Sequence, residues 1–139
     1  MRKREMTQAS CRHCNEKIPN RNVYCNNTCQ VQYQREKYIT EWKEGKQKGS
    51  KGKNLVISNH IKWYLRNRSN NKCEQCGWNE INMFTGTVPL EVDHIDGNAA
   101  NCKEDNLRII CPNCHSLTPT FKNIGNRNSA RERKKDDFN

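Results

Sequence analysis

The spacing of the cysteines constrains this chain more than any other feature of its sequence. Eight of the nine cysteines form two groups of four, Cys11-x2-Cys14 with Cys25-x3-Cys29, and Cys73-x2-Cys76 with Cys111-x2-Cys114. Two closely spaced cysteines present both thiolates to one side of a zinc ion, and a second pair completes a tetrahedron. The sequence therefore predicts two structural Zn²⁺ ions, one in each group of four thiols.

A zinc-stabilised fold also fits the scarcity of apolar side chains. Leu, Ile, Val and Phe number 22 of 139 residues, and a charged chain with less than roughly 20% of these residues does not bury enough apolar surface to fold unaided. Residues 1–11 are polar throughout, unlike a secretory signal, and no run of apolar residues has the length of a membrane span. We therefore expect a cytoplasmic protein with no membrane partner. The cytoplasm is reducing, which favours zinc binding by the cysteines over disulfides.

Three further residues with metal-binding side chains are given no ligand role. Cys102 is left outside both groups and is expected to be a free thiol in a loop. His13 lies within the first cysteine pair, where a side chain usually points outward, so we expect it to face solvent. His60 has no partner nearby in the sequence and is expected to be a surface histidine.

Charge divides the chain into basic arms and an acidic centre. The net charge of +10 is distributed as +4 in residues 1–29, +8 in 30–72, −5 in 73–119 and +3 in 120–139. Carboxylates in the centre could hold a cation while the basic arms neutralise phosphates, as a metal-dependent enzyme acting on a polyanion requires. We expect nucleic acid as the partner of the basic arms, although charged runs are often only solvated surface. The expected DNA-binding residues are Lys46, Lys48, Lys51, Lys53, Arg66, Arg68, Lys122 and Arg127.

Composition places a domain boundary near residue 50. Residues 45–54 contain three Gly, four Lys and no apolar side chain, the composition of a flexible charged linker. Residues 1–44 are expected to form a small zinc finger whose second thiol pair opens a helix that ends at Gly45. Residues 55–123 form the main domain, and residues 124–139 a basic, disordered tail.

The main domain is predicted to be small and of the α+β class. Apolar side chains at helical intervals follow Ser58, a good N-cap, and predict a helix that ends near Ser69. Alternating apolar residues then predict a strand over 87–95 that leads into a hairpin or loop. A short strand at 108–110 and a helix over 112–118 complete the order of elements.

The main domain resembles the HNH endonucleases. The matching motifs are LEVDHIDGN at 90–98, EDNLRIICPNCH at 104–115 and the two thiol pairs of the second group, all in the family's order. The resemblance covers residues 57–123 and implies a ββα-metal fold, also called a His-Me finger and similar to a treble clef. In that fold two strands and a helix surround one catalytic cation, and the structural zinc lies behind them.

The resemblance also implies roles for individual residues. His94 would be the general base, Asp93 and His115 would hold the catalytic Mg²⁺, Mn²⁺, Ni²⁺ or Zn²⁺, and Asn106 would tie the loop that orients His94. The implied activity is hydrolysis of DNA, by a nick or a double-strand cut, to 5′-phosphate and 3′-hydroxyl ends. We expect the protein to be a monomer. It is similar to the small nucleases that bacteriophages encode for homing, packaging or degradation of host DNA. Pro119 stands where some relatives have a further metal-binding histidine.

Two considerations weigh against this interpretation. Adjacent side chains of a strand point to opposite faces, so Asp93 and His94 reach one site only if the strand ends, twists or bulges there. Each site residue also has an ordinary explanation, such as His115 serving as a zinc ligand. The alternative function is a non-catalytic zinc-finger DNA-binding protein that acts as a regulator or packaging accessory.

Overall fold

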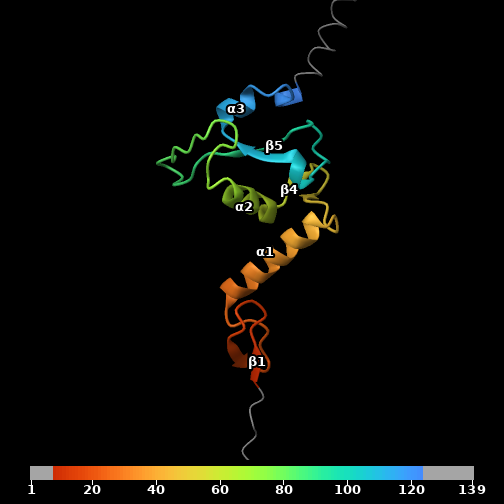
Figure 1. The fold of residues 1–139 in the computed structure, drawn as a ribbon, viewed down its shortest axis with the longest axis vertical. Coiled ribbons are helices and arrows are strands. Elements are labelled where there is room, and N and C mark those ends of the chain that lie inside the picture. The colour runs from red at the N-terminus through yellow and green to blue at the C-terminus, as the bar shows by residue number, and fades with distance from the viewer. Residues whose placement is uncertain (1–7, 124–139) are drawn as a thin grey trace, which may run out of the picture. The chain divides into compact units, whose positions relative to one another are not determined.

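The structure is a computed structural model that describes residues 8–123. The chain divides into two compact units, one up to Gln47 and one from Lys48 onward (Figure 1). This division falls within the segment 45–54 that composition marked as a linker. In the described part of the chain, no helix has the length and apolar character needed to cross a bilayer.

The first unit combines a small hairpin with a long helix. Strand β1 (Gln8–Ser10) pairs antiparallel with β2 (Lys17–Pro19), and helix α1 covers Asn27–Lys43. The side chain of Asn26 accepts a hydrogen bond from the backbone N–H of Cys29 at 2.8 Å and caps the helix. The thiol pair therefore opens the helix, as predicted.

The core of the first unit is very small. Trp42 on α1 is also buried, and the cluster at the hairpin consists of Cys11, Ile18 and Cys29, with partly buried Tyr24 packed against them. Two of these three buried side chains are proposed zinc ligands, so little apolar surface remains to hold the unit together without a metal ion.

The second unit opens with a hairpin that composition did not predict. Strand β3 (Ser50–Lys51) pairs antiparallel with β4 (Val56–Ile57). The backbone N–H of Ser58 also donates to the carbonyl of Gly49 at 2.9 Å. Part of the predicted flexible linker is therefore ordered, because backbone hydrogen bonds to Val56–Ile57 hold it in a strand.

Helix α2 (Asn59–Arg68) agrees closely with the prediction. Ser58 is its N-cap, with its side chain accepting a hydrogen bond from the N–H of His60, and the C-cap is Ser69. Ile61 and Leu65, one turn apart, are fully buried and form the packing face of the helix.

A two-stranded sheet forms the centre of the second unit. Strand β5 (Glu91–His94) pairs antiparallel with β6 (Leu107–Ile110), which places Asp93 opposite Arg108. Helix α2 packs against β6, and helix α3 (Pro112–Ser116) lies against β5, on opposite sides of the sheet (Figure 1). Short 3₁₀ helices, η1 (Glu104–Asn106) and η2 (Phe121–Asn123), complete the unit.

Strand β5 is shorter than the predicted strand over 87–95. Pro89 has no N–H to donate, and the N–H of Leu90 bonds back to the carbonyl of Val88 at 2.9 Å. The chain therefore turns just before Glu91, although Val88 and Leu90 are buried as the alternating pattern suggested. The order of strand, loop, strand and helix is confirmed.

Candidate metal centres and active site

The first group of cysteines converges at the junction of the hairpin and α1. The Sγ atoms of Cys11, Cys14, Cys25 and Cys29 all lie within 4.8 Å of one another. Backbone N–H groups, chiefly that of Cys14, lower the pKa of Cys11 to about 6. Sharing of a proton with Cys25 raises the pKa of Cys29. Because the thiols hinder one another's ionisation, a divalent cation at their centre would relieve the repulsion, and the geometry fits zinc.

The second group converges beneath α3. The Sγ atoms of Cys73, Cys76, Cys111 and Cys114 also lie within 4.8 Å of one another. Cys111 is the N-cap of α3, since its Sγ accepts a hydrogen bond from the N–H of Cys114 at 3.4 Å. Burial raises the pKa of Cys73, but backbone N–H groups outweigh it and lower that pKa to about 6. The thiol of Cys76 raises the pKa of Cys114 to about 12. Both groups can therefore hold zinc.

His13 does not face solvent as expected. Its side chain is 22% exposed, and its Nε2 lies 3.4 Å from Oε1 of Glu36 on α1. The Nδ1 atom is buried and has no hydrogen-bond partner among the described residues. The turn between Cys11 and Cys14 faces the helix, which the sequence pattern of the turn alone does not reveal.

The carboxylate of Asp93 lies at the centre of a charged cluster on β5, β6 and α3. Asp93 is only 4% exposed, and its Oδ2 accepts a hydrogen bond from Nε of Arg108 at 2.7 Å. Its Oδ1 lies 3.8 Å from Nε2 of His115. The Nδ1 atom of the same imidazole is hydrogen-bonded to the carboxylate of Glu91. The structure therefore brings Asp93 and His115 together, with one oxygen and one nitrogen atom facing each other.

Glu91 and Arg108 are members of this cluster that sequence reasoning missed. Glu91 precedes Asp93 by two residues and so points to the same face of β5. Arg108 lies opposite Asp93 in the register of the sheet. The spacing Glu-x-Asp was a usable signal for Glu91, whereas the partner of Arg108 follows only from the register.

His94 points to the other face of β5. Its Nε2 lies 3.8 Å from Sγ of Cys102, which is 5% exposed. Burial lowers the pKa of His94, although the charges of Asp96 and Asp93 act in the opposite direction. Burial also raises the pKa of the Cys102 thiol. Cys102 forms no disulfide, and it is a buried neighbour of His94, a contact that its position outside both thiol groups did not predict.

Asn106 fastens the loop that follows His94. Its Oδ1 accepts from the N–H of Asp96 at 3.0 Å, and its Nδ2 donates to Oδ1 of Asp96 at 2.9 Å and to the carbonyl of Asn101 at 2.8 Å. The backbone carbonyl of Asn106 also accepts from the N–H of Ile95 at 2.9 Å. These bonds hold the residues directly after His94 against the start of β6.

Two of the expected DNA-binding arginines have internal partners. The guanidinium of Arg66 donates to the backbone carbonyls of Val88 and Leu90 at 3.1 and 3.2 Å. Arg68 forms two hydrogen bonds to the carboxylate of Glu74. Both arginines tie α2 to the rest of the second unit, so their charges stabilise the fold.

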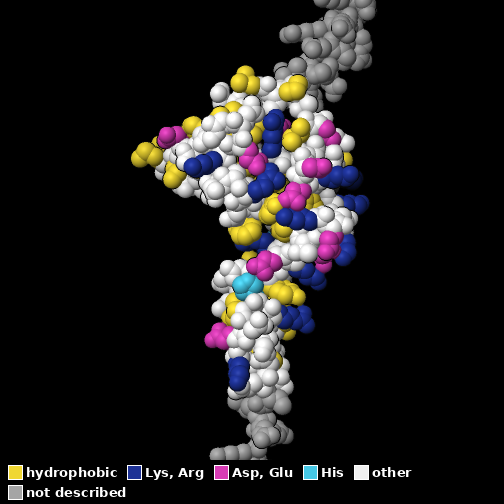
Figure 2. Space-filling model, viewed as in Figure 1, with side chains coloured by type: hydrophobic (Ala, Val, Ile, Leu, Met, Phe, Trp, Pro, Cys, Tyr) yellow, Lys and Arg dark blue, Asp and Glu magenta, His cyan; other side chains and the backbone are white. Residues whose placement is uncertain are grey.

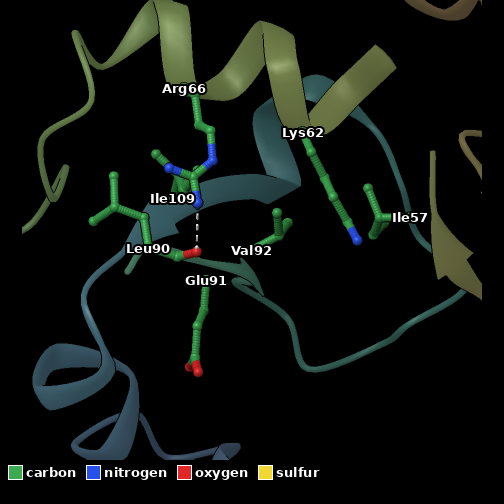
Figure 3. A pocket seen from close by; sticks show the side chains of 7 residues that line it. All are labelled: Ile57, Lys62, Arg66, Leu90, Glu91, Val92 and Ile109. Atoms are coloured by element: carbon green, nitrogen blue, oxygen red, sulfur yellow. Dashed lines mark hydrogen bonds between the residues drawn. The ribbon is translucent and has the colours of Figure 1, made fainter. Parts of the chain in front are cut away.

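Arg66 also faces a cavity of about 460 Å³ between α2 and the sheet, and Figure 3 shows its bond to the carbonyl of Leu90 there. Lys62 extends from the same helix along the cavity wall. The residues that line the cavity are Ile57, Lys62, Arg66, Leu90, Glu91, Val92 and Ile109.

The other expected DNA-binding residues differ in their surroundings. Lys46 forms an ion pair with Glu44 at 2.5 Å, and Nζ of Lys122 lies 5.1 Å from the centroid of the Phe121 ring. Arg127 lies outside the described residues. Three lysines in or just before the β3–β4 hairpin are exposed, namely Lys48, Lys51 and Lys53.

Comparison with known proteins points to the second unit. Residues 73–118 match the family model described as HNH endonuclease. The chain is 52% identical over 56 residues to a protein of Escherichia phage T5 named H-N-H endonuclease F-TflIV, a match that covers 39% of this chain and 24% of that protein. This chain thus spans about a quarter of the length of that relative. No solved structure matches.

Proposed function

We propose, on the premise that residues 73–118 are an HNH endonuclease domain, that this protein is a metal-dependent endonuclease acting on double-stranded DNA. The observation that carries this proposal is the pairing of Asp93 with His115. Their oxygen and nitrogen atoms, from β5 and α3, approach to 3.8 Å inside the matched segment. A carboxylate and an imidazole on rigid elements are suitable ligands for a catalytic divalent cation, and they leave coordination positions open for water and a phosphate oxygen.

Neighbouring residues prepare the two proposed ligands for a cation. Arg108 occupies Oδ2 of Asp93, so Oδ1 is the atom available to the metal. Glu91 binds Nδ1 of His115 and so keeps Nε2 directed at Asp93, an arrangement that recurs among metal-binding histidines. When bound, Mg²⁺, Mn²⁺, Ni²⁺ or Zn²⁺ would stabilise the charge that develops on the phosphate and the departing oxygen.

His94 is the proposed general base. It accepts a proton from the water that attacks phosphorus, the bond between phosphorus and the 3′-oxygen breaks, and the departing oxygen takes up a proton from solvent water, so that the ends carry a 5′-phosphate and a 3′-hydroxyl. The bonds of Asn106 to Asp96 and Asn101 support a role in holding the chain beside His94. His94 and Asp93 point to opposite faces of β5, so the proposal requires that one phosphate, bound at the end of the strand, is reached by His94 from one face and by the cation on Asp93 from the other.

The two groups of four thiols are proposed to hold structural Zn²⁺. With zinc bound, the first group stabilises the N-terminal finger, and the second anchors α3 and therefore His115. We further propose that the protein acts as a monomer in the cytoplasm of a bacterial host.

Cleavage of supercoiled plasmid by the full-length protein tests the enzymatic proposal. With one of the four divalent ions added, nicked or linear DNA should form, and His94→Ala should slow the reaction by about 10²–10⁴-fold, the usual contribution of a general base. His60→Ala is the matched control, because His60 lies on α2 and not in the proposed site. If the parent cut no DNA with any of these ions, binding without hydrolysis would become the preferred function.

Salt dependence tests the proposed DNA contacts separately from cleavage. Lys48, just before β3, and Lys51 and Lys53 of the β3–β4 hairpin are exposed, whereas Arg66 and Arg68 also bond internally. Replacing the three lysines by glutamine should reduce the slope of log affinity against log salt by about 0.9 for each phosphate that the variant no longer neutralises. An unchanged slope would assign phosphate binding to other residues.

A further inference from the structure

The second unit has a loop with an exposed apolar tip that takes no part in the proposed hydrolysis of DNA. Residues 79–86 project from the body of this unit, and hydrophobic side chains cover the end of the projection (Figures 1 and 2). Phe84 is 100% exposed and Met83 is 94% exposed, and Ile81 beside them is 63% exposed. Adjacent, fully exposed Phe and Met side chains are unfavourable in water and indicate a binding surface.

The tip is held in one conformation by its own hydrogen bonds. The side-chain oxygen of Asn82 accepts from the N–H groups of Phe84 and Thr85 at 2.8 and 3.2 Å. The backbone of Asn82 bonds to Gly86 and Thr87 at 2.8 and 3.0 Å, and Gly86 adopts a positive φ of 67° that closes the turn. Local bonds therefore present Met83 and Phe84 outward, so little ordering is needed when the tip binds.

The base of the loop is connected to the proposed metal site. The loop leaves the turn at Cys76, and the Sγ of Cys76 belongs to the same group of four thiols as that of Cys114. The next residue along α3 is His115. A zinc ion in this group would therefore fix the tip relative to the proposed catalytic residues.

We propose that Met83 and Phe84 form a wedge that enters the minor groove of double-stranded DNA and partly unstacks one base step. This inference rests on the proposed function. Minor-groove proteins insert Phe, Met, Leu or Ile in this way and kink the duplex. Glu80 is the one charged residue of the loop 79–86, and residues 81–87, which include the tip, contain no charged side chain, which suits contact with stacked bases.

Size favours DNA over a protein partner. One aromatic side chain buries roughly 150–250 Å², whereas a stable protein interface buries about 800 Å² on each partner. Two protruding side chains are therefore too small to form a stable protein interface by themselves, whereas one or two apolar side chains are enough for a wedge that unstacks a base step.

Bending of a short duplex by the full-length protein, without added divalent cation, tests the wedge. Energy transfer between dyes at the two ends should rise on binding, and permanganate should oxidise thymines that the wedge unstacks. Phe84→Ala should abolish both signals and weaken binding by about tenfold, as expected for loss of one stacked ring. The dependence of affinity on salt should stay unchanged, because the number of neutralised phosphates is the same.

Two variants separate the wedge from a general effect of apolar surface. Val56→Ala removes a side chain that is 55% exposed on β4, outside the loop, and should bend DNA as the parent does. Phe84→Leu keeps an apolar wedge and should retain most of the bend. Zinc content and the melting curve should match the parent in both, which excludes a folding defect.

The outcomes distinguish the wedge from the function on which it rests. A parent that cuts plasmid but neither bends nor unstacks the duplex would overturn the wedge alone, as would Phe84→Ala bending DNA normally. A parent that neither binds nor cuts DNA would overturn both. Self-association of the parent that Phe84→Ala abolishes would assign the tip to a second copy of the chain and also overturn the wedge.

Discussion

The two groups of four thiols have the same ligands but occupy different positions in their units. In the first unit, the thiols make up most of the buried cluster at the hairpin, and the nearest histidine, His13, is paired with Glu36. In the second unit, apolar residues such as Ile61 and Leu65 supply a separate core, and the thiol group lies at the base of α3 directly beside His115. One zinc would therefore replace a core, whereas the other would position His115, a proposed ligand of the catalytic cation.

The largest expected effect comes from removing one cysteine of each thiol group and comparing the zinc content and the cleavage rate of the two variants. Structural zinc contributes about 10–16 kcal/mol to folding in zinc-finger peptides, so Cys111→Ser should unfold the second unit, lose one of two zinc ions per chain and abolish cleavage. Cys14→Ser should also lose one zinc ion and unfold the first unit. Plasmid cleavage should survive in Cys14→Ser, because the proposed catalytic residues all lie in the second unit.

Elemental analysis after dialysis and plasmid cleavage are the two measurements. Folded parent protein without zinc would show that the thiols are not ligands. Equal loss of cleavage in both variants would show that the catalytic unit depends on the first zinc as much as on the second.

A smaller effect is expected when His115 loses the carboxylate that orients its ring. Glu91→Gln keeps the size of the side chain but removes the negative charge that binds Nδ1 of His115. Loss of such a partner weakens metal binding by about 10–100-fold, so the divalent-ion concentration that gives half-maximal cleavage should rise by that factor. Zinc content should stay at the parental value.

Glu16→Gln is the matched control for this variant, because Glu16 is an exposed glutamate of the first unit, outside both the proposed site and the projecting loop. A cleavage rate restored by excess divalent ion would support a positioning role for Glu91. A rate that stayed low at every ion concentration would instead assign Glu91 a direct part in the chemistry.

The features predicted correctly from sequence are those that depend on local spacing. The cysteine pairs predicted both thiol groups, and Ser58, Ile61 and Leu65 predicted the start and the buried face of α2. The small α+β fold and the resemblance to HNH endonucleases are confirmed as well, the latter for residues 73–118. The assigned roles of Asp93, His94, Asn106 and His115 remain proposals.

The features that sequence reasoning missed depend on which segments meet in space. The ion pair of Arg108 with Asp93 requires the register of β5 and β6, which no local pattern determines. The internal partners of Arg66 depend on the path of the chain from Val88 to Leu90. A count of positive charges therefore identified the basic segments correctly but did not separate exposed lysines from arginines that hold the fold.

Substitution of Cys102, the cysteine outside both thiol groups, should have the smallest effect. It tests what a buried cysteine contributes when it is not a zinc ligand. Sequence alone predicts that Cys102→Ser is nearly silent, because Cys102 belongs to neither thiol group. In the structure Cys102 is 5% exposed and its Sγ lies 3.8 Å from Nε2 of His94. A serine hydroxyl there is a stronger hydrogen-bond donor and more costly to bury than a thiol, so we expect a loss of stability of about 1–2 kcal/mol and a several-fold slower cleavage. Two zinc ions per chain should remain, since neither group loses a ligand. Cys102→Ala adds no hydrogen-bond donor and should therefore cleave faster than Cys102→Ser. Equal cleavage rates in the two variants would show that the contact with His94 has no effect on catalysis. Loss of zinc in either variant would place Cys102 among the zinc ligands.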